Sequence, residues 1–237
     1  MDLSHVLWIG GPQGSGKSSI ARALADRFAL QLYHVDLRVW VHEPRMPSTE
    51  FASLSMDERW VHADTRSMVG WFVTTSRHRF RLVLEDLREL PDEPACIVEG
   101  PQLFPTSVSA VLRSPDQALF LIPERAELEL RLRARGPIEG TSDGERAREN
   151  AVARDLQLAQ TIEREARELR LPTLPVDRPL DGMIERAADH FAPVVERLPG
   201  GGDLQSVRAF EKDVRKTQIR LHKQWLKRAN AAKGTSR

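Results

Sequence analysis

Short apolar runs alternate along the chain with longer segments in which apolar residues recur every three or four positions. Short apolar runs are typical of buried parallel strands, and the longer period is typical of amphipathic helices. The runs predict strands at residues 5–9, 31–35, 95–99, 118–122 and 172–176. The longer segments predict helices at residues 17–28, 56–69, 70–89, 124–135, 144–171 and 180–198. This alternation indicates an α/β fold with a five-stranded parallel sheet.

Two glycine-rich stretches interrupt the alternation. Residues 136–144, with the sequence GPIEGTSDG, predict a mobile loop, and residues 199–202, within LPGGG, predict a linker. Beyond the linker, apolar residues recur at the spacing of an amphipathic helix: Val207, Phe210, Val214, Leu221 and Trp225. We therefore expect a main domain at residues 1–198 and a C-terminal helical extension at residues 203–237.

The composition is that of a soluble protein. Of the 237 residues, 41% are hydrophobic, enough for a sizeable core, and 29% are charged. Cys96 is the only cysteine, so an intrachain disulfide is excluded and a metal site built from cysteines is not expected. No apolar stretch approaches the length of a membrane-spanning helix, and the N-terminus does not resemble a signal peptide. We expect a cytoplasmic protein without membrane contact.

The charge is unevenly distributed along the chain. The whole chain carries 35 Lys/Arg and 34 Asp/Glu. The extension at residues 203–237 holds ten Lys/Arg and three Asp/Glu, a net charge of +7, which leaves −6 for the first 202 residues. A basic amphipathic helix is suited either to contact RNA or to bury its apolar stripe against its own domain or a sister subunit. Burial is the simpler explanation, so nucleic acid is not expected and a homodimer through the extension is a candidate.

A glycine-rich loop follows the first predicted strand. Residues 11–18, GPQGSGKS, match the phosphate-loop pattern G-x-x-x-x-G-K-S/T at every position. Backbone N–H groups of such a loop bind phosphate oxygens, helped by the N-terminus of the following helix. Lys17 is expected at the β- and γ-phosphates, and the Ser18 hydroxyl is the expected ligand of Mg²⁺. The expected nucleotide-binding residues of the loop are Gly11, Gly14, Ser15, Gly16, Lys17, Ser18 and Ser19.

Two carboxylates are predicted at strand ends beside this loop. Asp36 closes the second strand, LYHVD, and Glu99 closes the third, CIVEG. Ligands of parallel sheets bind beyond the carboxyl ends of the strands, so both side chains are expected in the phosphate crevice. Asp36 is suited to accept the proton of an attacking hydroxyl, and the alternative is an ordinary cap or turn residue. Glu99 is expected to contact either Mg²⁺ or the acceptor, and the absence of a second acid after it disfavours a motor or switch.

On these residues the chain resembles the adenylate-kinase-like group of P-loop small-molecule kinases. This group includes gluconate and shikimate kinases, nucleoside monophosphate kinases and chloramphenicol phosphotransferase. The resemblance covers about residues 5–195 and rests on GGPQGSGKSS, the strand ends HVD and IVEGPQL, and the arginine-rich stretch after the fourth strand. It implies a three-layer P-loop NTPase fold, ATP and Mg²⁺ as cofactors, and Asp36 as the general base, in the place of the chloramphenicol enzyme's catalytic aspartate.

The resemblance also implies roles for arginines near the nucleotide. In the family, an arginine in the helix after the fourth strand stacks on adenine, and a second one four residues later meets phosphate. Arg131 and Arg135 have that spacing, and Arg154 matches an arginine of the helix that returns from the family's lid. The lid is expected at about residues 131–154, with Arg135 and Arg154 stabilising the transferred phosphoryl group. Asp177 lies where the family's backbone surrounds the adenine edge, and the alternative is an ordinary surface turn.

The acceptor is expected to bind between the second and third strands. This insert spans about residues 37–94 and is wide and rich in tryptophan and arginine. Arg45, Arg59 and Trp60 are its candidate acceptor-binding residues. The alternative for Trp60 is a core residue, and the alternative for both arginines is an exposed surface charge.

The function that accounts for these features is an ATP-dependent phosphotransferase acting on a hydroxyl group. The expected acceptor is a small molecule: a nucleoside, a sugar or an antibiotic-like alcohol. The competing hypothesis is a nucleotide-regulated binding protein or ATPase that uses its basic C-terminal helix to bind RNA or a partner. The sequence leaves open which alcohol is the acceptor and whether ATP or GTP is the donor.

Overall fold

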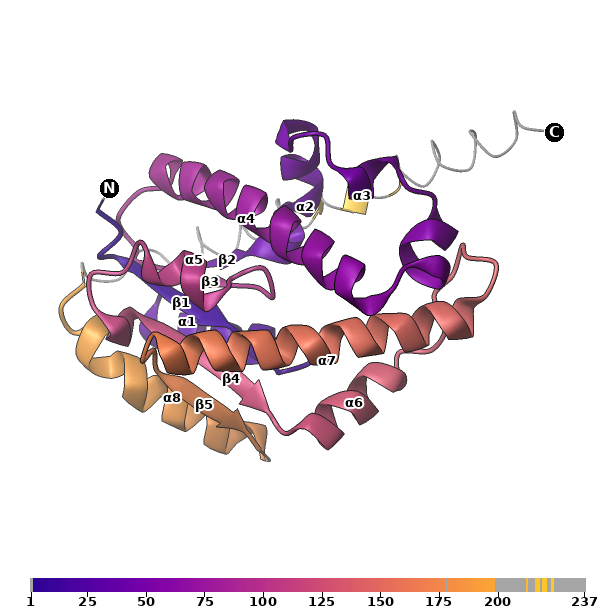
Figure 1. Cartoon of the computed structure of the whole chain (residues 1–237). Coiled ribbons are helices and arrows are strands. Elements are labelled where there is room, and N and C mark those ends of the chain that lie inside the picture. The colour runs from indigo at the N-terminus through magenta and orange to yellow at the C-terminus, as the bar shows by residue number, and fades with distance from the viewer. Residues whose placement is uncertain are drawn as a thin grey trace.

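A computed structural model describes residues 2–177 and 179–198, together with positions 212, 216, 217, 219, 220 and 223. Its centre is a sheet of five parallel strands in the order β2-β3-β1-β4-β5 (Figure 1). The strands are β1 (Val6–Gly10), β2 (Gln31–His34), β3 (Cys96–Glu99), β4 (Ala118–Pro123) and β5 (Thr173–Val176). Each lies within one residue of its predicted position, which confirms the α/β fold with a five-stranded parallel sheet.

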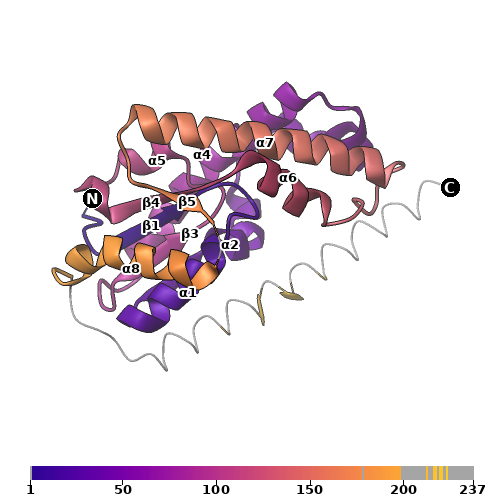
Figure 2. The same ribbon diagram turned by 90° about the horizontal axis from the view of Figure 1, so that it is seen from below.

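Helices cover both faces of the sheet, which gives three layers (Figures 1 and 2). The larger helices are α1 (Lys17–Phe28), α2 (Val35–His42), α4 (Thr65–Glu89), α6 (Arg125–Arg133), α7 (Gly144–Glu168) and α8 (Leu180–Val195). The shorter elements are η1 (Glu43–Arg45), α3 (Glu50–Ser53), the π-helical η2 (Glu58–His62), α5 (Pro105–Ser109) and η3 (Pro115–Gln117).

Alternation along the central strand divides the core in two. Val6 and Trp8 of β1 pack with residues of α4 and α7, whereas Leu7 and Ile9 pack with residues of α1 and α8. All four side chains are fully buried. A strand that is apolar on both faces is required where helices cover both sides of a parallel sheet.

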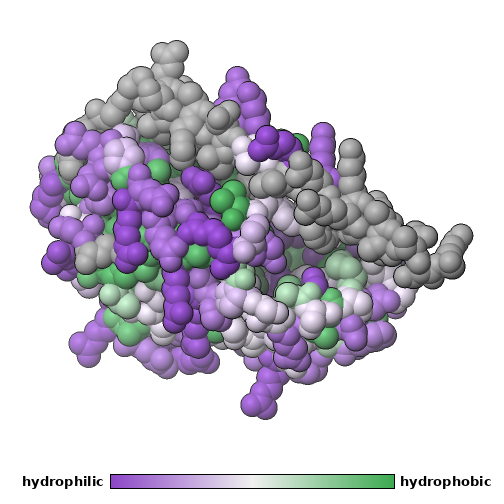
Figure 3. All heavy atoms as spheres, turned by 90° about the horizontal axis from the view of Figure 1, so that it is seen from above, coloured by the Kyte–Doolittle hydropathy of each residue, from purple (hydrophilic) through white to green (hydrophobic). Residues whose placement is uncertain are grey.

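Hydrophilic residues predominate on the outer face seen in Figure 3, with small hydrophobic areas between them.

The segment between β2 and β3 differs from the sequence prediction in two ways. The second strand ends at His34, and the chain continues directly into α2, a helix that the sequence pattern did not predict. The two helices expected at residues 56–69 and 70–89 are instead the short η2 and a continuous α4. Asp64 caps α4 by accepting a hydrogen bond from the Ser67 N–H (3.0 Å), and this cap sets the boundary between them.

Several predictions about element ends and flanking segments can be compared with the structure. Ser55 and Glu58 form a reciprocal cap before η2, with bonds of 2.7 and 3.2 Å. Helices α6, α7 and α8 each end two or three residues before their predicted limits. No helix of residues 2–177 and 179–198 is long and apolar enough to span a membrane. The linker and helix predicted for residues 199–237 lie outside the described residues, apart from the six single positions.

Candidate active site

The phosphate loop joins β1 to α1 with a backbone that requires glycine. Gly11, Gly14 and Gly16 have φ angles of 138°, 80° and 88°, values that side-chain-bearing residues rarely adopt. A Cβ atom on Gly11 would lie 2.8 Å from the carbonyl oxygen of Leu121. Gly16 is the N-cap of α1 and provides no side-chain cap, so the first N–H groups of the helix stay available to an anion.

Lys17 is a buried cation held inside this loop. Its side chain is 5% exposed, and Nζ lies 2.8 Å from the Pro12 carbonyl oxygen and 3.5 Å from Oγ of Ser15. Burial lowers the pKa of Lys17, while the negative charges of Glu99 and Asp36 act in the opposite direction. A buried ammonium group whose hydrogen-bond acceptors are neutral is suited to receive the charge of a phosphate.

The ends of β2 and β3 supply an acidic group beside Ser18. Glu99 is 2% exposed, and its Oε1 accepts a hydrogen bond from the Ser18 hydroxyl (3.1 Å) and lies 2.5 Å from His34 Nδ1. Burial alone would raise the pKa of Glu99, but the hydrogen bond with His34 and the charge of Lys17 outweigh it and hold the pKa below its usual value. The carboxylate is therefore ionised at neutral pH.

These oxygens fit Mg²⁺. The second oxygen of Glu99, Oε2, is buried and has no hydrogen-bond partner within the described part of the chain. Protein Mg²⁺ sites of this kind combine one or two oxygen ligands with water and substrate phosphates, so Ser18 and Glu99 are sufficient. His34 was not among the predicted site residues. In the sequence, His34 is visible only as a residue near the end of the second predicted strand. In the sheet it pairs in register with Glu99 of β3.

Asp36 lies in the first turn of α2 and not at the end of a strand. The predicted strand ran one residue too far, and the negative charge of Asp36 acts on Lys17. The carboxylate is exposed, and Oδ1 accepts a hydrogen bond from Gln102 Nε2 (2.7 Å). Gln102 is 9% exposed, and its own Oε1 is buried without a partner in the described chain. Gln102 orients Asp36, and no sequence motif indicates this role.

Arg131 and Arg135 both contact the phosphate loop. Arg131 Nη1 donates a hydrogen bond to the Gly14 carbonyl (3.0 Å), and Arg135 Nη1 donates to Oε1 of Gln13 (2.7 Å). Helix α6 ends at Arg133, so Arg135 lies just past the helix rather than within it, contrary to the prediction. The two guanidinium groups nevertheless reach the same loop from one side.

Helix α7 brings two more arginines towards this region. Arg148 donates to the Gly136 carbonyl, and burial together with the like charge of Arg135 lowers the pKa of Arg148. Arg154 is 8% exposed and forms an ion pair with Asp155, with Nη2 2.6 Å from Oδ1. The positive charges of Arg135 and Arg154 both act on Arg148, and the negative charge of Asp155 offsets them in part.

A pocket on the nucleotide side has a volume of about 640 Å³. It is lined by Ser15, Gly16, Ser19, Arg131, Val176, Asp177, Pro179, Leu180 and Met183. Arg131 and Asp177, expected at the adenine, thus border one pocket that begins at the phosphate loop. Asp177 is held at its edge by Arg186 of α8, with one bond of 2.9 Å.

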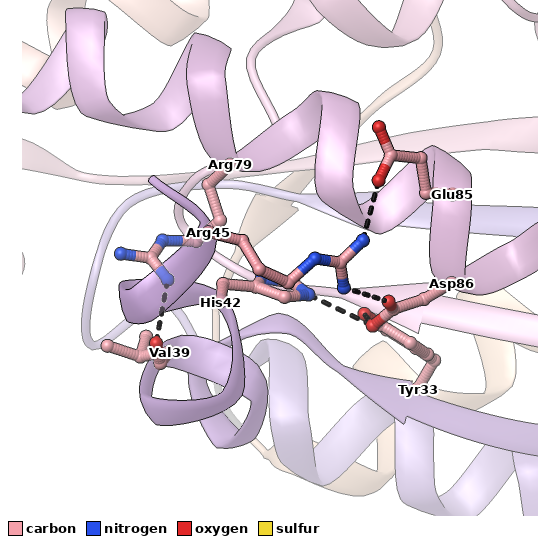
Figure 4. Close-up of polar contacts among 7 residues, drawn as sticks. All are labelled: Tyr33, Val39, His42, Arg45, Arg79, Glu85 and Asp86. Carbon is pink, nitrogen blue, oxygen red and sulfur yellow. Dashed lines mark hydrogen bonds and ion pairs between the residues drawn. The ribbon is translucent and has the colours of Figure 1, made fainter. Parts of the chain in front are cut away.

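Arg59, Trp60 and Arg154 line a second, smaller cavity, whereas Arg45 lies elsewhere. Arg45 forms ion pairs with Glu85 (2.5 Å) and Asp86 (3.2 Å) of α4 (Figure 4). Its guanidinium group thereby fixes η1 to α4.

Asp86 is the centre of that polar cluster (Figure 4). Its Oδ2 accepts a hydrogen bond from the Tyr33 hydroxyl (2.6 Å) and lies 2.9 Å from Nε2 of His42, which is fully buried. Burial would raise the pKa of Asp86, but the hydrogen bonds with His42 and Tyr33 lower it to about 2. These contacts join β2, the end of α2 and α4, and so hold the helix that carries Asp36.

The strand order and the phosphate loop between β1 and α1 define an adenylate-kinase-like P-loop fold, as the sequence resemblance implies. No protein-family model and no curated protein matches the chain. Among solved structures it is similar to TT1252 from Thermus thermophilus, with 24% identity and a TM-score of 0.50 over 82% of this chain and 98% of that one. At this identity the likeness supports the fold alone.

Two kinases are also similar to the chain. A gluconokinase from Sinorhizobium meliloti 1021 is 17% identical, with a TM-score of 0.39 over 81% of this chain and 93% of that one. A shikimate kinase from Bacteroides thetaiotaomicron is 16% identical, with a TM-score of 0.40 over 81% of this chain and 98% of that one. At these scores the likeness assigns no activity to the chain.

Proposed function

We propose that this protein is an ATP-dependent phosphotransferase that moves the γ-phosphate to a hydroxyl group of a small molecule. The observation that carries the proposal is an exposed carboxylate, Asp36, two residues after His34, whose ring contacts the Glu99 carboxylate that binds Ser18 of the phosphate loop. The buried Lys17 and the Ser18–Glu99 pair suit the donor side. Asp36, oriented by Gln102, suits the acceptor side.

The proposed reaction is a single in-line transfer. The acceptor oxygen forms a bond to the γ-phosphorus while the bond from that phosphorus to the bridging oxygen of ADP breaks. Asp36 accepts the proton of the attacking hydroxyl. Lys17 and Arg135 stabilise the negative charge on the phosphoryl oxygens. When bound, Mg²⁺ would be held by Ser18 and Glu99 and would neutralise charge on the β- and γ-phosphates.

The nucleotide is proposed to enter the pocket of about 640 Å³. Arg131 borders the pocket beside the loop, where its planar guanidinium group can stack on a purine. Asp177, held by its ion-pair partner Arg186, also lines the pocket. The loop N–H groups and the start of α1 would then receive the phosphates.

The substitution Asp36→Asn tests the proposal. It keeps the size of the side chain and its contact with Gln102 but removes the proton acceptor, so phosphorylation of an acceptor should fall by about 10²–10⁴-fold. Nucleotide affinity should change little, since Asp36 is not part of the loop. The measurement is ADP release with and without a panel of alcohols, followed by a nucleotide titration.

Two results would contradict the proposal. ATP turnover that no alcohol accelerates would favour an ATPase or a nucleotide-regulated binding protein. Normal kcat and KM for every acceptor in the Asn variant would show that Asp36 is only a turn residue and would leave Glu99 as the remaining carboxylate.

A further inference from the structure

A second cavity, distinct from the nucleotide pocket, lies between α3, η2, α4 and α7. Its volume is about 60 Å³. Its walls are mostly apolar and include Phe51, Trp60, Met68, Trp71 and Phe72. The aromatic groups support one another, since the rings of Phe51 and Trp71 lie 5.9 Å apart. Such walls bind apolar groups and offer few partners to hydroxyl groups.

One guanidinium group in this wall lacks part of its hydrogen bonding. Arg59 lies over the Phe51 ring at 4.6 Å and donates one bond, from Nη2 to the Ala52 carbonyl (2.9 Å). Its Nε is buried and has no hydrogen-bond partner among the residues that the structure describes. Burial lowers the pKa of Arg59, and Glu43 opposes this only through space. A carboxylate from a ligand would supply the missing partner.

Arg154 of α7 forms another part of the cavity wall. The Arg154 guanidinium group lies 4.9 Å from the Trp60 ring and 5.5 Å from the Phe72 ring. Its ion-pair partner Asp155 is 4% exposed and is one of the charges that act on Lys17. The Arg154–Asp155 ion pair therefore links the cavity wall to a charge that acts on the lysine of the phosphate loop.

The volume limits what can be enclosed. An engineered apolar cavity of about 150 Å³ binds one benzene ring, so a cavity of about 60 Å³ suits one or two methyl groups and not a purine. A sugar would lose the hydration of its hydroxyl groups against aromatic walls without gaining equivalent hydrogen bonds.

We propose that the acceptor is a compact alcohol that carries a small branched apolar group and one carboxylate. The apolar group fills the aromatic cavity, and the carboxylate pairs with Arg59. This inference rests on the proposed phosphotransferase function and narrows its substrate class, since it disfavours nucleosides and polyhydroxylated sugars.

Three related alcohols test the two requirements separately in the unmodified protein. The probe 3-hydroxy-2,2-dimethylpropanoate has a hydroxyl, two methyl groups and a carboxylate. The compound 3-hydroxypropanoate lacks the methyl groups, and 2,2-dimethylpropane-1,3-diol lacks the carboxylate. We expect kcat/KM for the first, measured by ATP-dependent ADP release, to exceed each of the others by about tenfold, which is the usual effect of burying two methyl groups or forming one charged hydrogen bond.

The substitution Arg59→Met tests the carboxylate contact, because it keeps an apolar stem and removes the charge. KM for the dimethyl hydroxy acid should rise about tenfold or more, whereas kinetics with the diol should stay unchanged. Arg77→Met is the matched control, since Arg77 is an exposed residue of α4 that does not line the cavity. If Arg59→Met does not fold, Arg59→Lys and the comparison of the three alcohols still decide the question.

The two proposals can fail separately. Preferential phosphorylation of gluconate or a nucleoside over the dimethyl hydroxy acid would overturn the acceptor inference and leave the phosphotransferase intact. ADP release that responds to none of a broad set of alcohols would overturn both. Equal kcat/KM for the three probes, or an Arg59→Met variant with an unchanged KM, would also contradict the acceptor inference.

Discussion

Lys17 illustrates how a single side chain prepares the site. Its ammonium group is buried and donates hydrogen bonds to a carbonyl and a hydroxyl of its own loop. These neutral acceptors can be exchanged for phosphate oxygens when a nucleotide enters. A cation held at the required position before the charge arrives does not need to reorganise during the reaction.

We predict that Lys17→Met abolishes most of the activity while preserving the fold. The apolar stem remains, but the charge beside the β- and γ-phosphates is lost, so kcat should fall by about 10²–10³-fold. Steady-state kinetics with an accepted alcohol measure this loss, and circular dichroism checks the fold. Turnover within a few-fold of the parent protein would show that the phosphate-loop assignment is wrong.

Gly100 and Gly70 differ in the space around their Cα atoms. A Cβ on Gly100 would lie 2.8 Å from the Val35 Cβ atom and 2.9 Å from Oε1 of Gln102, whereas a Cβ on Gly70 of α4 would contact nothing within 4 Å. Gly100→Ala should destabilise the protein by about 1–3 kcal/mol through overpacking, and Gly70→Ala should stabilise it by about 0.5–1 kcal/mol. Urea unfolding measures both changes. Equal stabilities would contradict the close contact of β3 with α2.

At the scale of the element, α2 is the part of the site that the sequence pattern did not predict. Its residues, VDLRVWVH, can be interpreted as the end of a strand followed by a loop, because they have no clear cap or glycine boundary. Contacts from far along the chain hold the helix, since Asp86 of α4 binds His42 and Arg45. Such pairings are invisible to local patterns.

The low pKa of Asp86 makes this attachment dependent on pH. A carboxyl group whose folded-state pKa is about 2, below its usual 3.8, stabilises the protein above the higher value. This contribution, roughly 2 kcal/mol, is lost as the pH falls from about 4 to about 2. Asp86→Asn should therefore lower the unfolding free energy at pH 7 and flatten its decrease between pH 4 and pH 2. An Asn variant that follows the wild-type curve at every pH would contradict this role.

At the scale of the whole molecule, the sequence predicted most of the architecture and only part of the site. Strands that are apolar on both faces and are separated by amphipathic helices are typical of a parallel sheet. The loop residues around Lys17 followed from a motif whose spacing is dictated by phosphate geometry. The pairings of Glu99 with His34 and of Asp36 with Gln102 join segments more than sixty positions apart, so only the folded structure brings them together.

Every residue assigned here to the donor and acceptor sites lies within residues 2–198. We therefore predict that a chain ending at residue 198 still binds ATP, with an affinity within about threefold of the full chain. Titration with a fluorescent ATP analogue measures this, and size-exclusion chromatography of both chains tests whether the extension mediates the homodimer expected from the sequence. Loss of nucleotide binding in a folded, truncated protein would show that the extension contributes to the site.

The tryptophans in the small cavity give the protein a built-in optical reporter. Trp60 and Trp71 line the space proposed for the acceptor, and the Arg154 cation lies over the Trp60 ring. Indole emission responds to the polarity and charge around the ring, so entry of a ligand should alter the fluorescence without any label. Trp8, fully buried beneath α4, should contribute a constant signal. Candidate acceptors can thus be ranked by binding alone, before any of them is shown to react.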